Sequence, residues 1–312
     1  MAEQKDADDK AAAEQQQAQA PEANGGVADS GEPHPHRRTA AELAGVPETM
    51  LWTLYHRAAE ARRPDTVLPD PHAVEAVEAV GFPFVERFGH AHTLVSQAIA
   101  LRAGCFDAVV REFLQEYPAG TVVSLGEGLE TAFWRVDNGS VRWLTVDLPQ
   151  PLALRRALLP HGPRQRVLAC DARDTAVWTA GVDPADGVLV LAQGLLMDLR
   201  PPEVRRLLAD CADAFPGGGL VFDAVPRTGV RPGRHRPRRV SGRYHLPPMP
   251  WRMDGADRPR LATAHPGIVE IRDVPLPRGR GPVWGLLAPQ LGRVPALRNK
   301  LPSVTLLRFA SR

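Results

Sequence analysis

The chain is 312 residues long, which is enough for one large domain or two small ones. Hydrophobic residues make up 44% of it and charged residues 24%, as is typical of globular proteins. The formal net charge is only +2, and no apolar run approaches the ~18 residues of a membrane helix. The composition therefore argues against a nucleic-acid-binding protein with a strong basic field and against a membrane protein.

The cysteines and the first residues indicate the cellular context. Cys105, Cys170 and Cys211 are far apart and odd in number, which excludes a disulfide framework and a CxxC metal site. Each lies in an apolar stretch, so we expect buried thiols and no metal ion. The N-terminus has neither the basic nor the apolar segment of a signal peptide. We therefore expect a cytoplasmic protein.

Residues 1–40 are predicted to form a disordered tail. Up to Arg38 the segment is rich in Ala, Gln, Glu, Asp, Gly and Pro, and its only aliphatic residue larger than Ala is Val27. Such a segment cannot bury enough apolar surface to offset the entropy lost on ordering. The folded part is expected to begin near Thr39, where Thr39 to Glu42 resembles a capping box.

Three helices are predicted ahead of the first strand, over 48–63, 71–80 and 93–117. In the third, apolar residues recur at steps of three and four, which is typical of a buried helix face. These residues are Phe106, Val109, Val110, Phe113, Leu114 and Tyr117. Pro118 and Gly120 end the helix.

The pattern then changes to short β-rich runs that alternate with helical segments. The helical segments are clearest over 151–159 and 202–215. Nearly continuous apolar strands separated by helices are typical of a parallel sheet covered on both faces. The five runs cover residues 121–125, 141–146, 166–169, 187–192 and 219–223.

The C-terminal part is different in character. Residues 225–265 are rich in Arg and Pro and are predicted to be irregular. Two late strands are predicted over 267–274 and 303–309, joined by a long Pro- and Gly-rich connection. We expect them to close one edge of the sheet as an antiparallel pair.

Three of the predicted strands end in residues that suit a ligand. Gly126 and Gly128 follow the first strand, Asp147 ends the second, and Asp171 follows the third. The glycines allow a close backbone approach, and a carboxylate after the second strand can accept both hydroxyls of a ribose. Dinucleotide enzymes need a third glycine, whose place is taken here by Thr131. The pattern favours S-adenosyl-L-methionine over NAD(P), with an NAD(P)-dependent oxidoreductase as the alternative.

Several motifs resemble those of the leucine carboxyl methyltransferase family. Residues 124–131 (SLGEGLET) with Arg135 resemble its LGxGLDT…R motif. Residues 146–149 (VDLP) resemble its vDLP, and residues 192–197 (AQGLLM) resemble its AEGLLMYL. Upstream, residues 57–70 are similar to its RAxEsrRPD…D segment.

Residues 222–226 (FDAVP) are similar to the branch of this family that contains tetracenomycin-type polyketide O-methyltransferases. The resemblance implies a class I S-adenosylmethionine-dependent methyltransferase. The implied fold is α/β and Rossmann-like, with a doubly wound seven-stranded sheet whose last strand is antiparallel. An N-terminal helical cap over 41–118 would precede a core over 119–312 that includes the basic loop 225–265.

The resemblance also implies how individual residues would hold the methyl donor. Gly126 and Gly128 would lie against its methionine part. Asp147 would hold the ribose. Asp171 and Ala172 would meet the adenine.

Four further residues follow from the same resemblance. Arg102, on the long helix, would pair with the methionine carboxylate, which suits a bidentate guanidinium. Gln193 replaces a Glu near the donor's amino group, so Gln193→Glu is expected to tighten donor binding by restoring the charge. Glu130 replaces an Asp of the family pattern, and Asp198 stands where the family usually has Tyr.

The expected function is methyl transfer from S-adenosyl-L-methionine to a carboxylate or hydroxyl of a small-molecule acceptor such as a polyketide-type secondary metabolite. A non-catalytic donor-binding relative is a further alternative, motivated by Gln193. No catalytic base is identified, because His92, His245 and His265 are expected to be structural or exposed. The sequence indicates no nucleic-acid or membrane partner and no particular oligomeric state.

Two features have both a functional and a structural interpretation. The Arg-rich run from Arg227 to Arg243 is either a lid or clamp for an acidic substrate or a solvated loop. Tyr244, Trp251 and Trp284 either face an aromatic substrate or pack inside the protein.

Overall fold

The computed structural model describes residues 46–227, 238–241 and 243–311. These residues all belong to one compact unit of the chain, His36–Arg312. The tail expected over 1–40, the capping box at Thr39 and most of the Arg-rich run lie outside the described residues.

Helices come first in the chain, and three of them lie within two residues of the predicted positions. A fourth helix is short, and its five residues do not complete enough turns to show a helical period in the sequence. The apolar side chains of the first three helices form one cluster. The four helices are α2 (Val46–Ala61), α3 (Pro71–Ala79), α4 (Phe84–Phe88) and α5 (Thr93–Glu116).

α5 is a core helix. Within the described part of the chain it is the one helix with the length and composition of a membrane span. Its apolar side chains instead pack inside the protein, where Phe106, Val109 and Val110 meet Val122 and Leu189 of the sheet.

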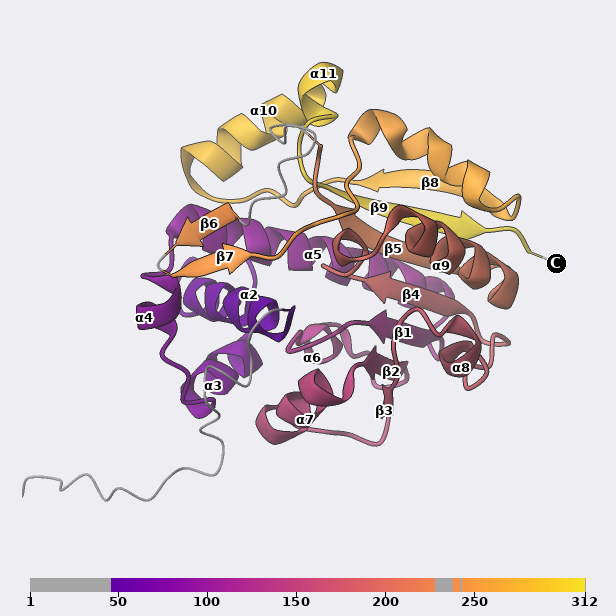
Figure 1. Ribbon diagram of the computed structural model, residues 1–312, viewed down its shortest axis with the longest axis horizontal. Helices are drawn as coiled ribbons and strands as arrows, with labels where there is room; N and C mark the ends of the chain where they lie inside the picture. Colours follow the sequence, from indigo (N-terminus) through magenta and orange to yellow (C-terminus); the bar gives the residue numbers. More distant parts are fainter. Residues whose placement is uncertain (1–45, 228–237, 242, 312) are drawn as a thin grey trace, which may run out of the picture. The chain divides into compact units, whose positions relative to one another are not determined.

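Seven strands form one sheet in the order β3-β2-β1-β4-β5-β9-β8 (Figure 1). The first five in this order are parallel, whereas β9 is antiparallel to both of its neighbours. The doubly wound sheet and the antiparallel pair of late strands are confirmed. The strands are β1 (Thr121–Leu125), β2 (Arg142–Asp147), β3 (Gln165–Ala169), β4 (Val188–Ala192), β5 (Gly219–Ala224), β8 (Ile268–Val274) and β9 (Ser303–Phe309).

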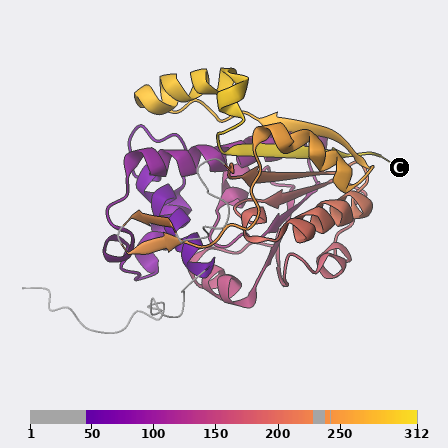
Figure 2. The ribbon, with the colours of Figure 1, turned by 45° about the horizontal axis from the view of Figure 1, so that its top comes forward.

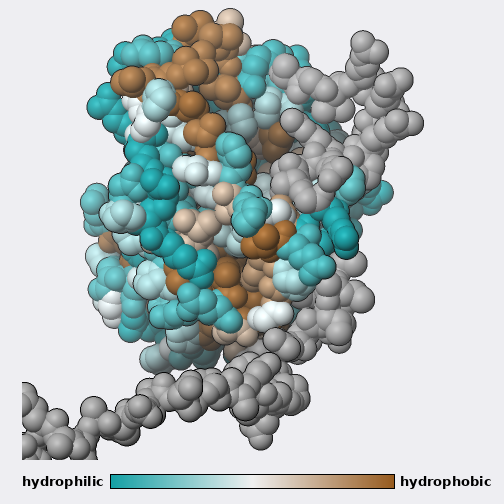
Figure 3. Space-filling view, turned by 90° about the vertical axis from the view of Figure 1, so that its left-hand side faces the viewer, coloured by the Kyte–Doolittle hydropathy of each residue, from teal (hydrophilic) through white to brown (hydrophobic). Residues whose placement is uncertain are grey.

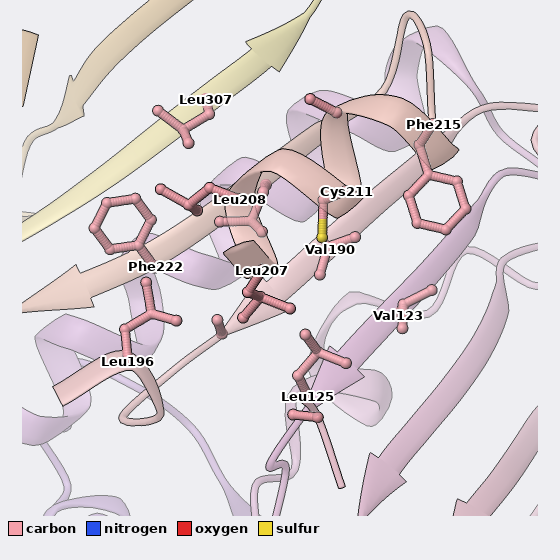
Figure 4. Packing of buried hydrophobic residues seen from close by; sticks show 14 of the residues in the cluster. Val123, Leu125, Val190, Leu196, Leu207, Leu208, Cys211, Phe215, Phe222 and Leu307 are labelled. Atoms are coloured by element: carbon pink, nitrogen blue, oxygen red, sulfur yellow. The ribbon is translucent and has the colours of Figure 1, made fainter. Parts of the chain in front are cut away.

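Helices cover both faces of the sheet. Alternate residues of a strand point to opposite faces, so Val122 and Leu189 pack against α5, whereas Val123 and Val190 pack against α9 (Pro201–Ala214). Figure 4 shows the second layer, in which side chains of α9 meet those of β1, β4 and β5. The other connecting helices are α6 (Ala132–Val136), α7 (Pro149–Leu158) and α8 (Thr175–Thr179).

The segments around β8 hold several short elements. The prediction of an irregular segment over 225–265 is wrong at residues 238–241, 244–246 and 255–264, because Pro and Gly interrupt the periodicity by which elements are recognised. The elements are a hairpin of β6 (Arg238–Ser241) and β7 (Tyr244–Leu246), two helical segments, η3 (Gly255–Ala264, 3₁₀) and η4 (Pro282–Leu287, π), and two short helices, α10 (Ala288–Arg293) and α11 (Pro295–Arg298).

The β8–β9 connection reaches the N-terminal half of α5 (Figure 2). Trp284 Nε1 donates a hydrogen bond of 3.1 Å to the Leu94 carbonyl. The backbone N–H of Arg280 donates one of 2.6 Å to Gln97 Oε1. These contacts place the connection beside the carboxyl ends of the parallel strands.

Candidate active site

A large cavity opens at the carboxyl ends of the parallel strands, between α2, α5 and the β8–β9 connection. Its volume is about 1140 Å³, which is large enough for two ligands of moderate size. This edge of a doubly wound sheet is where such folds bind their ligands. All seven residues that the sequence predicts for donor binding line the cavity, namely Arg102, Gly126, Gly128, Asp147, Asp171, Ala172 and Gln193.

The loop after β1 needs glycine at two positions. Gly126 has a φ of +60° and Gly128 a φ of +53°, in the left-handed region that side chains disfavour. A Cβ at Gly126 would lie 3.1 Å from Leu195 Cδ1, and one at Gly128 would lie 3.0 Å from Met50 Cβ. The loop is therefore held against both the β4 loop and α2.

Asp147, the last residue of β2, is tied to this glycine loop. Its carboxylate accepts hydrogen bonds of 2.7 Å from the backbone N–H groups of Gly128 and Leu148. Burial raises the pKa of the carboxyl, and the two N–H groups oppose that shift. The two N–H groups thus fix the carboxylate at the edge of the cavity, and the charge of the nearby Arg155 also favours its ionised form.

Arg102 and Asp223 form an ion pair in the cavity wall. Arg102 Nη1 lies 2.9 Å from Asp223 Oδ2, and Asp223 Oδ1 accepts a 2.6 Å hydrogen bond from the Gly194 N–H. Arg102 Nε is buried and has no hydrogen-bond partner among the described residues. A buried donor without a partner in a cavity wall suits an acceptor group on a ligand.

Asp171 and Ala172 follow β3. Arg173 donates three hydrogen bonds to the Asp171 carboxylate, at 2.6 Å from Nη2 and 2.9 Å from Nε and from the backbone N–H. The hydrogen bonds from the Arg173 side chain hold the pKa of Asp171 below its usual value. Ala172 is buried, and its carbonyl accepts a 3.0 Å hydrogen bond from Trp178 Nε1.

A buried charge network connects the helices to the glycine loop through Glu130. Its Oε2 lies 3.0 Å from Arg57 Nη1, and its Oε1 lies 2.9 Å from Arg135 Nη2. Burial by itself would raise the pKa of Glu130, but Arg57 and Arg135 outweigh it and bring the pKa to about 2. Gln193, at the end of β4, donates a 2.8 Å hydrogen bond from Nε2 to Glu130 Oε2.

Asp70 extends the network to the start of α3. It caps this helix by accepting a 3.1 Å hydrogen bond from the Ala73 N–H. The same carboxylate lies 3.1 Å from both Arg57 Nε and Arg135 Nη1. The sequence motifs at residues 57–70 and 124–135 therefore meet as one ion network, in which every charge has a partner.

The rest of the cavity wall is largely apolar. Trp284 lines it, which agrees with the substrate-facing interpretation, whereas Tyr244 is 1% exposed and Trp251 packs on Phe222. None of the three candidate bases His92, His245 and His265 is among the lining residues. The apolar wall includes Met50, Trp52, Ile99, Met249, Trp284 and Leu287.

Asp223 and Asp198 are among the polar residues of the wall that the sequence did not identify as site residues. Asp223 lies inside β5, and the apolar residues around it in the sequence do not indicate a ligand site. Asp198 is the last residue of a short 3₁₀ turn, η2 (Leu196–Asp198), and was noticed only as a departure from the family pattern. Burial and the neighbouring Asp223 raise the pKa of Asp198 to about 6.

The thiols differ from the expectation at one position. Cys105 and Cys211 are buried, but Cys170 is only partly buried and lines the cavity. It follows β3 directly, where the chain turns toward the ligand edge of the sheet. Among the described residues, no three His, Cys, Asp or Glu side chains gather in a group that could hold a metal ion.

Comparison with known proteins decides the family. A model described as leucine carboxyl methyltransferase matches residues 50–212, more than half of the chain. The chain belongs to the leucine carboxyl methyltransferase family. The match covers the glycine loop, Asp147, Asp171 and Gln193, so these proposed donor-binding residues lie within the family's shared region, whereas Asp223 and the β8–β9 connection lie outside it.

Individual relatives agree with this family assignment. The tetracenomycin polyketide synthesis O-methyltransferase TcmP of Streptomyces glaucescens is 33% identical over 184 residues, which are 59% of this chain and 67% of that protein. The S-adenosyl-L-methionine-dependent methyltransferase dpfgK of Gibberella zeae is 30% identical over 202 residues, 58% of this chain and 67% of that protein. The expected family and methyltransferase activity are confirmed, and the cofactor is S-adenosyl-L-methionine rather than NAD(P).

A solved structure shows the same fold. A crystal structure of a candidate methyltransferase from Thermobifida fusca YX superposes with a TM-score of 0.51 at 20% sequence identity. The superposition covers 86% of this chain and 100% of that one, so the similarity in fold extends well beyond the motifs.

Proposed function

We propose that this member of the family transfers a methyl group to an oxygen, of a carboxylate or a hydroxyl, on a small and largely apolar molecule. The observation that supports this most is that one continuous cavity is lined both by the polar ends of the parallel strands and by the broad apolar wall. Aromatic and aliphatic lining of this kind suits a planar ring system. The relative named for tetracenomycin polyketide synthesis favours a polyketide-type acceptor. The cytoplasmic location stays a prediction.

The polar strand ends have features that fit S-adenosyl-L-methionine. Gly126 and Gly128 line the cavity without side chains, so the backbone of this loop can approach a ligand closely. The buried Nε of Arg102 lacks an acceptor, and the methionine part of the donor carries a carboxylate.

We therefore keep the seven proposed donor-binding roles. Gly126 and Gly128 would contact the methionine part and Arg102 its carboxylate. Asp147 would accept the ribose hydroxyls. The adenine would contact Asp171 and Ala172, and Gln193 would face the amino group through its Oε1.

The donor brings an already activated methyl group as a sulfonium. The protein's part is then to align the acceptor oxygen with that group and to keep water out. Alignment would come from the fixed donor site, and dryness from the apolar wall formed by α2 and the β8–β9 connection.

The alternative of a non-catalytic relative rests on Gln193. The hydrogen bond from Gln193 to Glu130 gives this amide a local role, so its presence needs no loss of function to explain it. We therefore favour an active enzyme.

Two measurements test the proposal. A thermal-shift comparison of S-adenosylhomocysteine, NAD and NADP should show stabilisation by the first alone, of ~2.7 kcal/mol at one hundred times its dissociation constant. Incubation with S-adenosyl-L-methionine and a panel of aromatic acids and phenols should then yield O-methylated products by mass spectrometry. A shift with NAD, or methylation of nitrogen or carbon instead of oxygen, would contradict the proposal.

A further inference from the structure

Asp223 joins two segments of the cavity wall that lie far apart in the sequence. Its Oδ2 lies 2.9 Å from Nη1 of Arg102 on α5, and its Oδ1 accepts a 2.6 Å hydrogen bond from the N–H of Gly194, which follows β4. The β4 loop passes close to the guanidinium, since a Cβ at Gly194 would lie 3.7 Å from Arg102 Nη1. One carboxylate of β5 therefore fixes both the Arg102 side chain and the β4 loop.

The two members of the ion pair differ in how far they reach the cavity. Both line it, but the Asp223 side chain is only 8% exposed, whereas that of Arg102 is 23% exposed. Both oxygens of Asp223 already accept hydrogen bonds from the protein. Arg102 is thus the member that a ligand can contact, and Asp223 holds it from the protein side.

Arg102 depends on Asp223 for its orientation. Among the described residues Asp223 is the only hydrogen-bond and ion-pair partner of this guanidinium, and the buried Nε has no acceptor there. A free arginine side chain has many rotamers. Holding it in one rotamer before a ligand arrives removes that entropic cost from binding.

We infer that Asp223 is a positioning residue of the donor site, which holds Arg102 so that its remaining N–H groups can meet the carboxylate of the donor's methionine part. The inference rests on the proposed function, in which Arg102 contacts this carboxylate, and it adds the residue that orients the contact. Asp223 lies beyond residues 50–212, so the family match by itself assigns it no role.

Removal of the charge at position 223 should redirect Arg102. Asp198 also lines the cavity and interacts electrostatically with Asp223. Without Asp223 this second carboxylate competes for the guanidinium, and the Gly194 N–H loses its charged acceptor. The donor's carboxylate then meets an arginine that is no longer held in one orientation.

The test compares two ligands that differ by one carboxylate, S-adenosylhomocysteine and its decarboxylated analogue, in calorimetry on the full chain at pH 7.5. Asp223→Asn should weaken S-adenosylhomocysteine binding about tenfold and change the affinity for the analogue by no more than about twofold. Asp273→Asn is the matched control, because Asp273 lines the same cavity but is paired with Arg258 at 2.7 Å. It should change neither affinity by more than about twofold.

A double-mutant cycle tests whether Asp223 acts through Arg102. Arg102→Ala should weaken S-adenosylhomocysteine binding at least as much as Asp223→Asn does, and it should likewise spare the analogue. In the Arg102→Ala background, Asp223→Asn should cost no more than about a further twofold, because the side chain that it positions is gone. The cycle needs S-adenosylhomocysteine alone, so it decides between the outcomes even where the analogue binds too weakly to measure.

A purely structural role for Asp223 would give a different result. General loosening of the β4 loop would weaken both ligands to the same extent, and its effect would multiply with that of Arg102→Ala. Melting temperatures measured beside the affinities show whether each variant folds. If Asp223→Asn does not fold, Asp223→Glu serves instead, because it keeps the charge but displaces it by one methylene group. It should weaken S-adenosylhomocysteine binding at least about threefold and spare the analogue.

The outcomes separate this inference from the proposed function. If S-adenosylhomocysteine does not bind wild type, the proposed function fails. If it binds and Asp223→Asn weakens both ligands equally, or neither of them, the function stands and the inference is overturned. Losses that multiply in the double variant, or an unchanged affinity for S-adenosylhomocysteine in Arg102→Ala, also overturn it.

Discussion

The amide Nε2 of Gln193 donates a 2.8 Å hydrogen bond to Oε2 of Glu130. Both positions depart from the family motifs, and the structure makes them one pair. Glu130 is a methylene longer than the Asp of the family pattern, and it contacts Arg57, Arg135 and Gln193 together. With an ionised carboxylate already in that place, a neutral amide at position 193 can donate where a second carboxylate could not.

This pair reverses the expected effect of Gln193→Glu. The sequence alone favours tighter donor binding, but the new carboxylate would lie against Glu130, whose pKa of about 2 keeps it charged. We expect the variant to lose ~2 kcal/mol of stability, because it loses the hydrogen bond and gains a repulsion. Its affinity for S-adenosylhomocysteine should fall several-fold at neutral pH. Denaturant unfolding and calorimetry measure the two effects.

The control for this variant is the exchanged pair, Glu130→Gln with Gln193→Glu. It restores one carboxylate and one amide, so it should be more stable than the sum of the two single changes predicts. Tighter donor binding by Gln193→Glu together with an unchanged melting temperature would show that Glu130 moves away and that the charge at position 193 faces the donor.

Asp147→Ala should weaken S-adenosylhomocysteine binding about tenfold or more, since the proposed ribose contacts are charge-assisted. The structure adds that this carboxylate also fixes the Gly128 N–H at 2.7 Å, so the change loosens the glycine loop as well. Asp147→Asn keeps one acceptor oxygen and should lose less. Asp186→Ala, an exposed carboxylate paired only with Arg142, is the matched control for charge. If calorimetry gives wild type and Asp147→Ala the same affinity for S-adenosylhomocysteine, Asp147 has no role in binding the ligand.

Gly128→Ala should destabilise the protein and weaken donor binding. A side chain at a φ of +53° costs ~1–2 kcal/mol, and its Cβ would lie 3.0 Å from Met50 Cβ. Gly139→Ala separates the two costs, because Gly139 has a φ of +81° and nothing within 4 Å of its Cβ position. Gly139→Ala should therefore show the backbone cost alone, without an effect on S-adenosylhomocysteine affinity. If Gly128→Ala destabilises the protein no more than Gly139→Ala does, the Met50 side chain moves aside without a cost in stability.

His56 should make the stability depend on pH. Burial lowers its pKa to about 4, with a smaller contribution from His92, while its Nδ1 lies 2.8 Å from Ser96 Oγ. The unfolded chain therefore binds this proton more readily than the folded one. The free energy of unfolding should therefore decrease by up to ~3 kcal/mol as the pH falls from 6.5 toward 4. In unfolding experiments, His56→Gln should reduce the difference in stability between pH 4.5 and pH 7.5. An unchanged difference would show that other groups cause the pH dependence.

Figure 3 shows apolar surface gathered around the end of the molecule that carries α10 and the neighbouring connection. Leu286 and Leu287 there are 65% and 52% exposed, and Leu287 also lines the cavity. The same short elements thus form part of the apolar wall and of the outer surface. Their sequence has no clear period, which is why it predicts only a long Pro- and Gly-rich connection between the two late strands.

The sequence by itself determined the frame of this protein. Nearly continuous apolar runs and the helical face of Phe106 to Tyr117 are local patterns, and they predicted the sheet, its helices and the place of α5. Gly126, Gly128, Asp147 and Asp171 could be assigned to one ligand edge because the ends of parallel strands must meet there.

Only the tertiary structure decided which side chains became partners. Glu130 and Gln193 are 63 residues apart, and Arg102 and Asp223 are 121 apart, so no local pattern connects them. The raised pKa of Asp198 is likewise set by its burial and by its neighbour Asp223 on β5, which the chain order does not reveal. Charge pairing and desolvation depend on distance in space, and the fold alone sets that distance.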